Sequence, residues 1–484
     1  MSKTILYPID QHYEKSGIIL QHQNIAYTCT LNQTSIEDNK NKFYIMQVIQ
    51  RDKNYDHFIR YGRIGEPGKS SIDTYADPKG AMIAFEKQFK LKTGNAWKDK
   101  DNFVKKEGKY YLTEVTYEIE KSAIVEIKQT PSKLSDRVQQ LVKLISDVDS
   151  IKRALIEFNI DVKKMPLGKL GKTQIDLAQG ILNKITSVIN LKNDIASTEA
   201  QVTELSSQYY TFIPYSCGRK KPPIISTKEQ IGDYMAQLDD LRQIEVAVKI
   251  NDSIQNSSMH PFDTVYDKLN TNIQPLDKNS NMWSKIETYI KNTHASTHDF
   301  KVTLVDIFDV ARVGENKQYS DYTKNIGNKQ LLWHGSRMSN FCSILQKGLL
   351  INPETLGVYV TGKMFGGASI YLANAFSKSA NYCAHTTSNN YACLLLCEVA
   401  LGVPSKRTQA DYYITKQSLK KAGCDSTWGM GKTTPSNYIV MDDIKIPNGK
   451  LDASGINSVL LYDEFIVYDS NQLNIKYMVI VKIN

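Results

Sequence analysis

The sequence lacks the features that mark a secreted, disulfide-bonded or membrane-spanning protein. Its seven cysteines are an odd number and include no C-x-x-C pair, so we expect reduced thiols and no zinc finger. No apolar run approaches the roughly 18 residues of a membrane span, and Pro8 and Asp10 interrupt the short apolar run at the amino terminus, which argues against a signal peptide. The G-x-G-x-x-G and G-x-S-x-G motifs are also absent, which argues against a redox dinucleotide fold and a serine hydrolase.

Neither charge sign dominates the chain. Sixty Lys and Arg residues against fifty-one Asp and Glu residues leave a net charge of +9, which permits a polyanionic partner without requiring one. Hydrophobic residues make up 41% and charged residues 23%, which is typical of globular proteins. At roughly 100–200 residues per domain, 484 residues predict about three domains.

Hydrophobic periodicity divides the chain into parts of different type. After an N-terminal segment (1–25), residues 26–125 alternate β-branched or aromatic residues with turn signals and contain one helical pattern at 78–97. Residues 130–252 carry helical apolar stripes, and residues 260–484 return to short apolar strands. We therefore expect a multidomain α+β protein with a small β-rich domain, an all-α helical bundle and a β-rich C-terminal domain.

Three segments of the C-terminal part combine residues suited to chemistry. His334 follows an apolar strand in LLWHGSRMSNF (331–341), although a single histidine at a strand end is more often structural. Tyrosines, a serine and a lysine crowd together in MFGGASIYLANAFSKSANYC (364–383), which suits a planar, phosphate-linked ligand or simply a packed helix. Glu464 lies in the apolar strand LLYDEFIVYD (460–469), where a carboxylate is costly without a partner or a role.

Together these segments resemble the catalytic domain of the poly(ADP-ribose) polymerases. The match is to H-G-S-R-x-x-N-F, I-Y-[FL]-A, S-K-S-A-N-Y-C and Y-x-E-[YF]-I-V-Y-[DN], and GKTTP (431–435) and KMPLGKL (164–170) also recur in that family. YGRIGEPG with KTGNAW (92–97) resembles the DNA-sensing WGR domain of these enzymes, and residues 131–250 resemble their helical regulatory domain. Because no zinc-finger region precedes the WGR-like part, the resemblance is to the short, finger-less type that DNA breaks activate.

The resemblance implies that NAD+ is consumed as a substrate and that no cofactor or metal is needed. It implies that Gly335 and Ser379 hold the nicotinamide carboxamide, that Tyr371 and Tyr382 line its ring, and that His334 holds a ribose hydroxyl. The implied NAD-binding residues are His334, Gly335, Ser336, Asn340, Tyr371, Ala373, Ser379 and Tyr382.

The resemblance also assigns catalysis to His334, Tyr371, Lys378 and Glu464. Glu464, aimed at the nicotinamide ribose, would stabilise the oxocarbenium-like charge of the transition state. A glutamate here accompanies chain elongation in the family, so we expect poly(ADP-ribose) as the product. Single-unit transfer and a catalytically weak DNA-break-binding scaffold remain the alternatives, because Leu350, Lys363 and the GGAS loop (366–369) depart from the family pattern.

A lysine-rich segment favours contact with DNA. Between Glu86 and Lys109, eight lysines oppose four acids, a local excess of +4 that suits phosphates or simply a solvated helix face. The resemblance adds Tyr61, which replaces the signature tryptophan, and Arg63, which would link DNA, the WGR-like domain and the helical domain. The DNA-binding residues expected are Tyr61, Arg63, Lys98, Lys100 and Lys105. Phosphate contacts of this kind recognise the structure of a break, not its sequence.

Location and partners are implied by the same resemblance. It implies a nuclear protein that acts on histones and on itself, with an accessory specificity factor and no membrane. GRKKPP (218–223) resembles a minimal nuclear address. His294 and His298 have the spacing of one helical turn, but no third ligand accompanies them, so we expect no metal site there.

Overall fold

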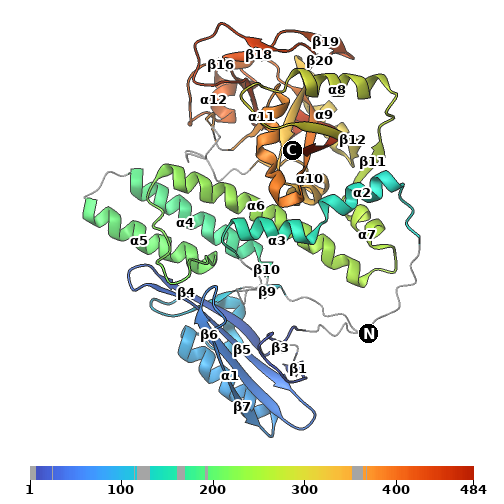
Figure 1. Cartoon of the computed structure of the whole chain (residues 1–484). Coiled ribbons are helices and arrows are strands. Elements are labelled where there is room, and N and C mark those ends of the chain that lie inside the picture. The colour runs from blue at the N-terminus through green and yellow to red at the C-terminus, as the bar shows by residue number, and fades with distance from the viewer. Residues whose placement is uncertain are drawn as a thin grey trace. The chain divides into compact units, whose positions relative to one another are not determined.

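The computed structural model describes residues 7–23, 25–113, 115–116, 131–160, 169–190, 195–351, 364–366 and 368–484 (Figure 1). The chain divides into two compact units. The first contains residues 1–128 and 152–245, and the second contains residues 129–151 and 246–484.

The first unit begins with an antiparallel sheet, blue in Figure 1. Its main path has the order β7-β6-β5-β4-β8, and β1 pairs with β5 beside it. Alternation along β5 sends Tyr44, Met46 and Val48 to one face, where they pack against the helix α1. The strands are β1 (Ile18–Ile19), β2 (Gln21–His22), β3 (Ile25–Ala26), β4 (Thr28–Ser35), β5 (Lys40–Gln50), β6 (Tyr55–Arg63), β7 (Lys69–Tyr75), β8 (Tyr111–Thr113) and β9 (Val115–Thr116).

Helix α1 (Pro78–Thr93) carries the buried stripe that its periodicity predicted. Asp77 caps its first turn by accepting a bond from the Gly80 amide at 2.9 Å. Gly94 ends the helix in the left-handed region, with φ of 74°, so the helix stops earlier than the predicted 97. The following 3-10 helix η1 (Trp97–Asn102) inserts Trp97 against the Phe85 ring, whose centroid lies 4.8 Å away.

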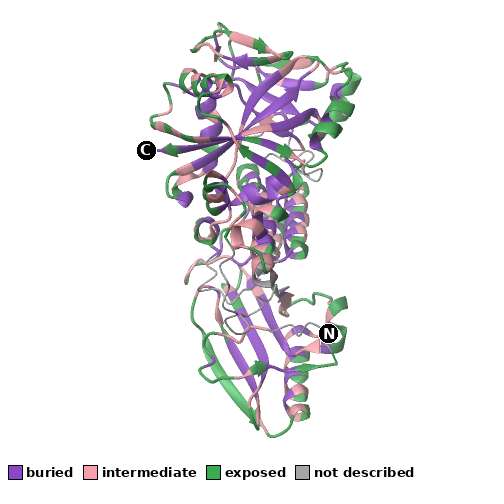
Figure 2. Cartoon of the chain, turned by 90° about the vertical axis from the view of Figure 1, so that its right-hand side faces the viewer, coloured by how far each residue is buried: buried purple, intermediate pink, exposed green. Residues whose placement is uncertain are grey.

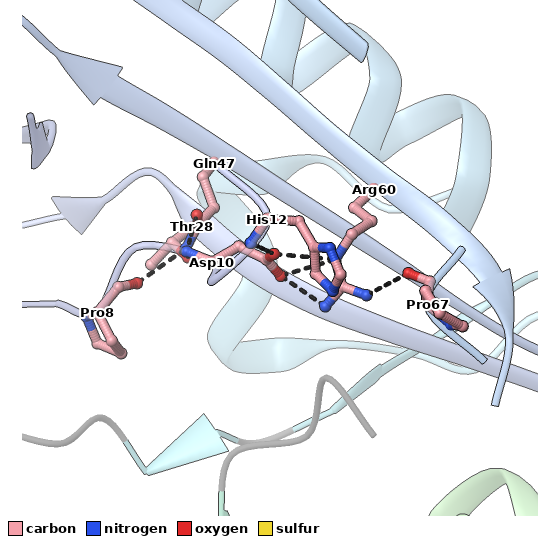
Figure 3. Close-up of polar contacts among 7 residues, drawn as sticks. All are labelled: Pro8, Asp10, His12, Thr28, Gln47, Arg60 and Pro67. Atoms are coloured by element: carbon pink, nitrogen blue, oxygen red, sulfur yellow. Dashed lines mark hydrogen bonds and ion pairs between the residues drawn. The ribbon is translucent and has the colours of Figure 1, made fainter. Parts of the chain in front are cut away.

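The opposite face of this sheet is covered by residues 7–13 (Figure 3). Asp10 accepts bonds from Arg60 at 2.7–3.0 Å, and these two side chains are only 5% and 3% exposed. The side-chain oxygen of Gln47 accepts a hydrogen bond from the main-chain amide of Asp10 at 2.9 Å. Within the N-terminal segment expected at 1–25, the residues from 7 onward pack on the β-rich domain. The partner of Asp10 lies fifty positions away, which no local pattern reveals.

The helical part of the chain confirms the predicted stripes. Ile175, Ala178, Leu182 and Ile185 are fully buried on α4. The helices are α2 (Asp136–Ile145), α3 (Val148–Glu157), α4 (Lys172–Asn190), α5 (Ile195–Phe212) and α6 (Lys228–Asp252), and the short strand β10 (Lys169–Leu170) pairs with β9. Most of the motif KMPLGKL (164–170) lies outside the described residues.

Helix α5 and the sheet of the first unit meet through polar contacts. The Thr34 amide donates to the Thr211 hydroxyl at 3.2 Å, and the Ile36 amide donates to the Ser207 hydroxyl at 2.9 Å. The side chain of Asn41 donates to the main-chain oxygen of Tyr215 at 2.8 Å. The β-rich domain and the helices 172–212 therefore belong to one packed unit.

The second unit is built on a seven-stranded sheet of order β11-β12-β23-β15-β13-β20-β19, beside a four-stranded sheet of order β14-β22-β17-β16. Its strands are β11 (Thr271–Pro275), β12 (Val302–Arg312), β13 (Lys329–Gly335), β14 (Ile370–Leu372), β15 (Tyr391–Ala400), β16 (Pro404–Arg407), β17 (Ser426–Gly429), β18 (Thr433–Pro435), β19 (Tyr438–Met441), β20 (Ile444–Pro447), β21 (Leu451–Ala453), β22 (Glu464–Val467) and β23 (Leu473–Ile483). Strands β15 and β23 supply much of its buried core (purple in Figure 2).

Short helices surround these sheets. They are α7 (Pro261–Lys268), α8 (Asn281–Asn292), α9 (Glu315–Tyr322), α10 (Phe341–Lys347), α11 (Phe376–Ala380), α12 (Lys416–Lys421) and the 3-10 turns η2 (Ser253–Asn256), η3 (Met338–Asn340), η5 (Asn381–Cys383), η6 (His385–Ser388) and η7 (Ser470–Gln472). Helix α2 joins this unit, because Arg137 pairs with Asp306 and donates to the Leu276 oxygen at 3.0 Å. Among the described helices, none is both long and apolar enough to cross a bilayer.

Candidate active site

Strand β13 joins the two sheets of the second unit and ends at the first predicted site residues. Trp333 and Ala373 exchange main-chain hydrogen bonds of 2.8 and 3.0 Å. The next residue, His334, has its Nδ1 atom 3.0 Å from the main-chain oxygen of Tyr371. A carbonyl can only accept, so this contact places the ring proton on Nδ1 and fixes the orientation of the imidazole.

The end of β13 packs directly on α11. A Cβ atom added to Gly335 would lie 1.9 Å from the main-chain oxygen of Ser379, so only glycine fits. The Ser379 hydroxyl, itself buried, donates to the Trp333 oxygen at 3.2 Å. The motifs HGSR and SKSANYC, some forty residues apart, thus meet at their glycine and serine.

The Tyr371 hydroxyl is fixed by main-chain groups. It accepts a bond from the Phe365 amide at 2.7 Å and lies 3.3 Å from the Gly366 oxygen. Burial raises the pKa of Tyr371 well above its usual value, so the phenol stays protonated at neutral pH. Tyr468 donates to the main-chain oxygen of Phe365 at 2.7 Å. Sequence reasoning missed Tyr468 as a partner, although it stands in the quoted Y-x-E-F-I-V-Y motif.

A buried ion pair joins α11 to β22. Lys378 Nζ lies 2.6 Å from Glu464 Oε1, and the two side chains are 15% and 9% exposed. Burial lowers the pKa of Lys378, and the carboxylate of Glu464 opposes that shift. The second carboxylate oxygen, Oε2, is buried and has no hydrogen-bond partner within the described residues. A buried acceptor of this kind can receive a hydroxyl of a bound substrate.

The other predicted NAD-binding residues lie along the same segments. Asn340 donates to the Ser336 hydroxyl at 2.9 Å, and Ala373 is buried beside Trp333. Tyr382 is 54% exposed. Leu350, at the position where the family carries an arginine, is 57% exposed, whereas Lys363 and Gly367 lie outside the described residues.

The two histidines considered as a metal pair have other contacts. His298 Nδ1 lies 2.8 Å from the Ser377 hydroxyl, and His294 Nε2 lies 3.2 Å from the main-chain oxygen of His298. Over the described ranges, no group of three or more His, Cys, Asp or Glu residues is arranged to hold a metal ion.

Tyr61 lies on an aromatic and basic surface of the first unit. Its ring is 45% exposed and stacks on the Tyr44 ring, with centroids 5.6 Å apart and planes 21° apart. Lys92 Nζ lies 4.6 Å from the Tyr44 ring. Stacked aromatics beside lysines are a common surface for the bases or sugars at a DNA end.

Arg63 links the sheet to the loop that follows α5. Its guanidinium donates to the main-chain oxygens of Gly218 and Lys220 and, at 2.9 Å, to that of Asn39. Nearby, a Cβ atom added to Gly65 would lie 2.3 Å from the Ser216 hydroxyl. The loop 216–220 therefore packs closely on the turn after β6.

The three predicted DNA-binding lysines differ in their surroundings. Lys98 is exposed. Lys100 pairs with the exposed Asp101 at 2.7 Å. Lys105 donates to the main-chain oxygens of Lys106, at 3.1 Å, and Lys109, so its ammonium group is partly engaged by its own turn.

Comparison with known proteins assigns each part of the chain. Family models match it in three places, namely the WGR domain at residues 27–104, the regulatory domain of poly(ADP-ribose) polymerase at 132–266, and the catalytic domain of poly(ADP-ribose) polymerase at 280–483. A poly(ADP-ribose) polymerase of Sarcophaga peregrina is 40% identical over 465 residues, which cover 93% of this chain and 45% of that protein.

Shorter relatives are matched over most of their length. Poly(ADP-ribose) polymerase 2 of Homo sapiens is 35% identical over 480 residues, which cover 95% of this chain and 80% of that protein. Poly(ADP-ribose) polymerase 2 of Zea mays is 35% identical over 492 residues, which cover 98% of this chain and 73% of that protein. The chain thus spans about half the length of the insect relative and most of the other two. This extent of identity shows that the chain belongs to the poly(ADP-ribose) polymerase family.

Proposed function

We propose that the protein is a poly(ADP-ribosyl)transferase that DNA strand breaks activate and that consumes NAD+ as its substrate. The observation that carries this proposal is the buried Lys378–Glu464 pair, with one oxygen of Glu464 left without a partner in the described residues. Glu464 lies on β22, which pairs with β14, the strand of Tyr371, and the main-chain oxygen of Tyr371 contacts His334. This arrangement combines a carboxylate, a fixed imidazole and a neutral phenol, which suits transfer at a ribose carbon.

The reaction breaks the bond between the nicotinamide nitrogen and the C1 carbon of its ribose. Nicotinamide leaves with the bonding electron pair, and the oxygen or other nucleophilic atom of the acceptor forms the new bond to C1 while losing a proton. Glu464 has two tasks in this step, namely to bind the ribose hydroxyl through its second oxygen and to polarise the acceptor. Its negative charge stabilises the positive charge that develops on the ribose only in the transition state.

Lys378 keeps the carboxylate of Glu464 in place through their 2.6 Å contact. Because the pair is buried, its 2.6 Å contact resists screening by solvent and salt. The nicotinamide ring is joined to the same ribose, and its carboxamide is held by the main chain of Gly335 and the hydroxyl of Ser379, two residues that approach each other closely. His334, oriented by the Tyr371 oxygen, holds a ribose hydroxyl.

DNA breaks act through the first unit in this proposal. The exposed Tyr61 ring contacts the break, and exposed lysines such as Lys98 contact phosphates. Arg63 then transmits the event to the loop 216–220 that follows α5. Binding loosens the helical bundle of residues 131–250 and shifts it towards a state that admits NAD+. The protein acts in the nucleus on acceptors such as histones and itself.

The test measures nicotinamide release and product length from NAD+, with and without a nicked DNA duplex. Glu464→Gln is the isosteric control for catalysis, and Asp452→Asn, at an exposed position of β21 in the same unit, controls for loss of a carboxylate. Long chains that require DNA and Glu464 are the expected result.

Each other outcome replaces part of the proposal. Single additions would mean a mono-ADP-ribosyltransferase, and tight DNA binding without nicotinamide release would leave a DNA-break-binding scaffold. For the regulatory step, hydrogen exchange of α4 and α5 should accelerate when nicked DNA is added. Unchanged protection of both helices would contradict the proposed opening.

A further inference from the structure

Asp463, the residue before Glu464, is almost completely buried and accepts hydrogen bonds from three directions. It is 1% exposed. Its Oδ1 atom accepts the Gly431 amide at 2.8 Å. Its Oδ2 atom accepts hydrogen bonds from the Thr434 hydroxyl at 2.7 Å and from the side-chain amide of Asn374 at 2.8 Å.

The donors come from segments that lie next to the strands of the candidate active site. Asn374 follows Ala373, which is bonded to Trp333 on the strand of His334. Gly431 follows β17, which pairs with β22 at Glu464. A Cβ atom added to Gly431 would lie 2.3 Å from the main-chain carbon of Tyr462, so this loop lies directly against the chain that enters β22.

Burying a carboxylate costs free energy, which hydrogen bonds to its oxygens must offset. Three neutral donors hold the Asp463 carboxylate, and its charge also acts on the nearby Lys378, whose hydrogen-bonding carboxylate is that of Glu464. Asp463 directly precedes Glu464, the first residue of β22, so the two side chains share one short stretch of main chain. Fixing Asp463 therefore restricts the direction in which Glu464 can point.

We propose that Asp463 is a positioning residue of the active site, which orients Glu464 towards Lys378 by tying the entrance of β22 to the loops at Asn374 and Gly431. Lys378 Nζ also lies 3.4 Å from the main-chain oxygen of Tyr462, so the peptide between Tyr462 and Asp463 contributes to the same alignment. This inference rests on the proposed transferase activity and adds to it a residue that contacts no substrate.

The first variant is Asp463→Ala, measured in the full chain with nicked DNA. A misplacement of about 1 Å at a reacting group costs on the order of 100-fold in rate, so we expect kcat to fall by about that factor. We expect the Kd for NAD+, measured by calorimetry, to change by less than about threefold, because the nicotinamide end depends on Gly335 and Ser379. Asp452→Asn, whose carboxylate is exposed, should retain the parental kcat.

The second variant exchanges the acid and the amide, Asn374→Asp combined with Asp463→Asn. It keeps one carboxylate and one side-chain amide in the same buried corner, so the hydrogen bond between the two positions can re-form with its direction reversed. We expect kcat to return to within about fivefold of the parent. A purely structural loss of packing would show no such recovery.

Hydrogen exchange of residues 464–467 provides a readout that does not depend on catalysis. Asp463→Ala should accelerate hydrogen exchange of these residues by at least about tenfold. In the double variant Asn374→Asp with Asp463→Asn, the exchange rate should return to that of the parent. The inference is overturned if Asp463→Ala leaves both kcat and hydrogen exchange unchanged. It is also overturned if the double variant Asn374→Asp with Asp463→Asn has a kcat no higher than that of Asp463→Ala. If the parent releases no nicotinamide, the proposed function fails, and the exchange readout alone still decides whether Asp463 fixes the strand.

Discussion

Replacing Asp10 by alanine tests whether the N-terminal residues are an integral layer of the β-rich domain. Arg60 would then keep its bond to the main-chain oxygen of Pro67, at 2.7 Å, and its position 5.0 Å from the Phe43 ring. It would lose the bonds of 2.7–3.0 Å to Asp10. Because Arg60 is only 3% exposed, water cannot replace those bonds without opening the sheet.

The expected cost is that of removing one partner from a buried ion pair, about 3–5 kcal/mol. At about 1.4 kcal/mol per tenfold change, this corresponds to a local opening equilibrium about 10² to 4 × 10³ times larger. Hydrogen exchange of β5 and β6, read from peptides that cover residues 43–63, should accelerate by that factor until global unfolding limits it.

Two variants make the result specific. Asp38→Ala removes the carboxylate of an exposed pair with Lys40, with side chains 54% and 42% exposed, and should leave exchange in these strands unchanged. The apolar pair Asp10→Leu with Arg60→Met should be less damaging than Asp10→Ala, because no buried charge is left unpaired. The reasoning is refuted if hydrogen exchange of β5 and β6 is as slow in Asp10→Ala as in the parent.

Three further predictions concern other sites. Burial lowers the pKa of His57 to about 4, below its unfolded value, so the stability that is fully present above about pH 6.5 is lost as pH falls towards 4. The free energy of unfolding of the first unit should fall by about 2 kcal/mol between neutral pH and pH 5, and His57→Gln should remove that component. Gly335→Ala should reduce kcat/KM by on the order of 100-fold, because the new methyl group meets the Ser379 oxygen at 1.9 Å; near-parental activity would exclude the close approach of β13 and α11. Tyr61→Ala should weaken binding to a nicked duplex by about 1–3 kcal/mol, measured by fluorescence anisotropy, without changing the slope against log salt concentration, because the phenol carries no charge. A change in that slope would show that Tyr61 acts through the neighbouring lysines.

Sequence alone determined the features that depend on nearby residues. The stripe of α1 follows from the spacing of its apolar residues, although Gly94 ends the helix before the predicted residue 97. The stripe of α4 was predicted in the same way. The motifs around His334, Ser379 and Glu464 were recognised because their residue order is specific to the family, which the family models then confirmed.

Only the tertiary structure decided which distant groups meet. The 2.6 Å contact of Lys378 with Glu464 spans 86 positions, and the Asp10–Arg60 pair spans 50. The hydrogen bond between Asn374 and Asp463 spans 89. Local spacing carries no information on such pairs, because sheet order and strand register determine them. A burial pattern can show that a carboxylate needs partners, but only the packed strands show which residues provide them.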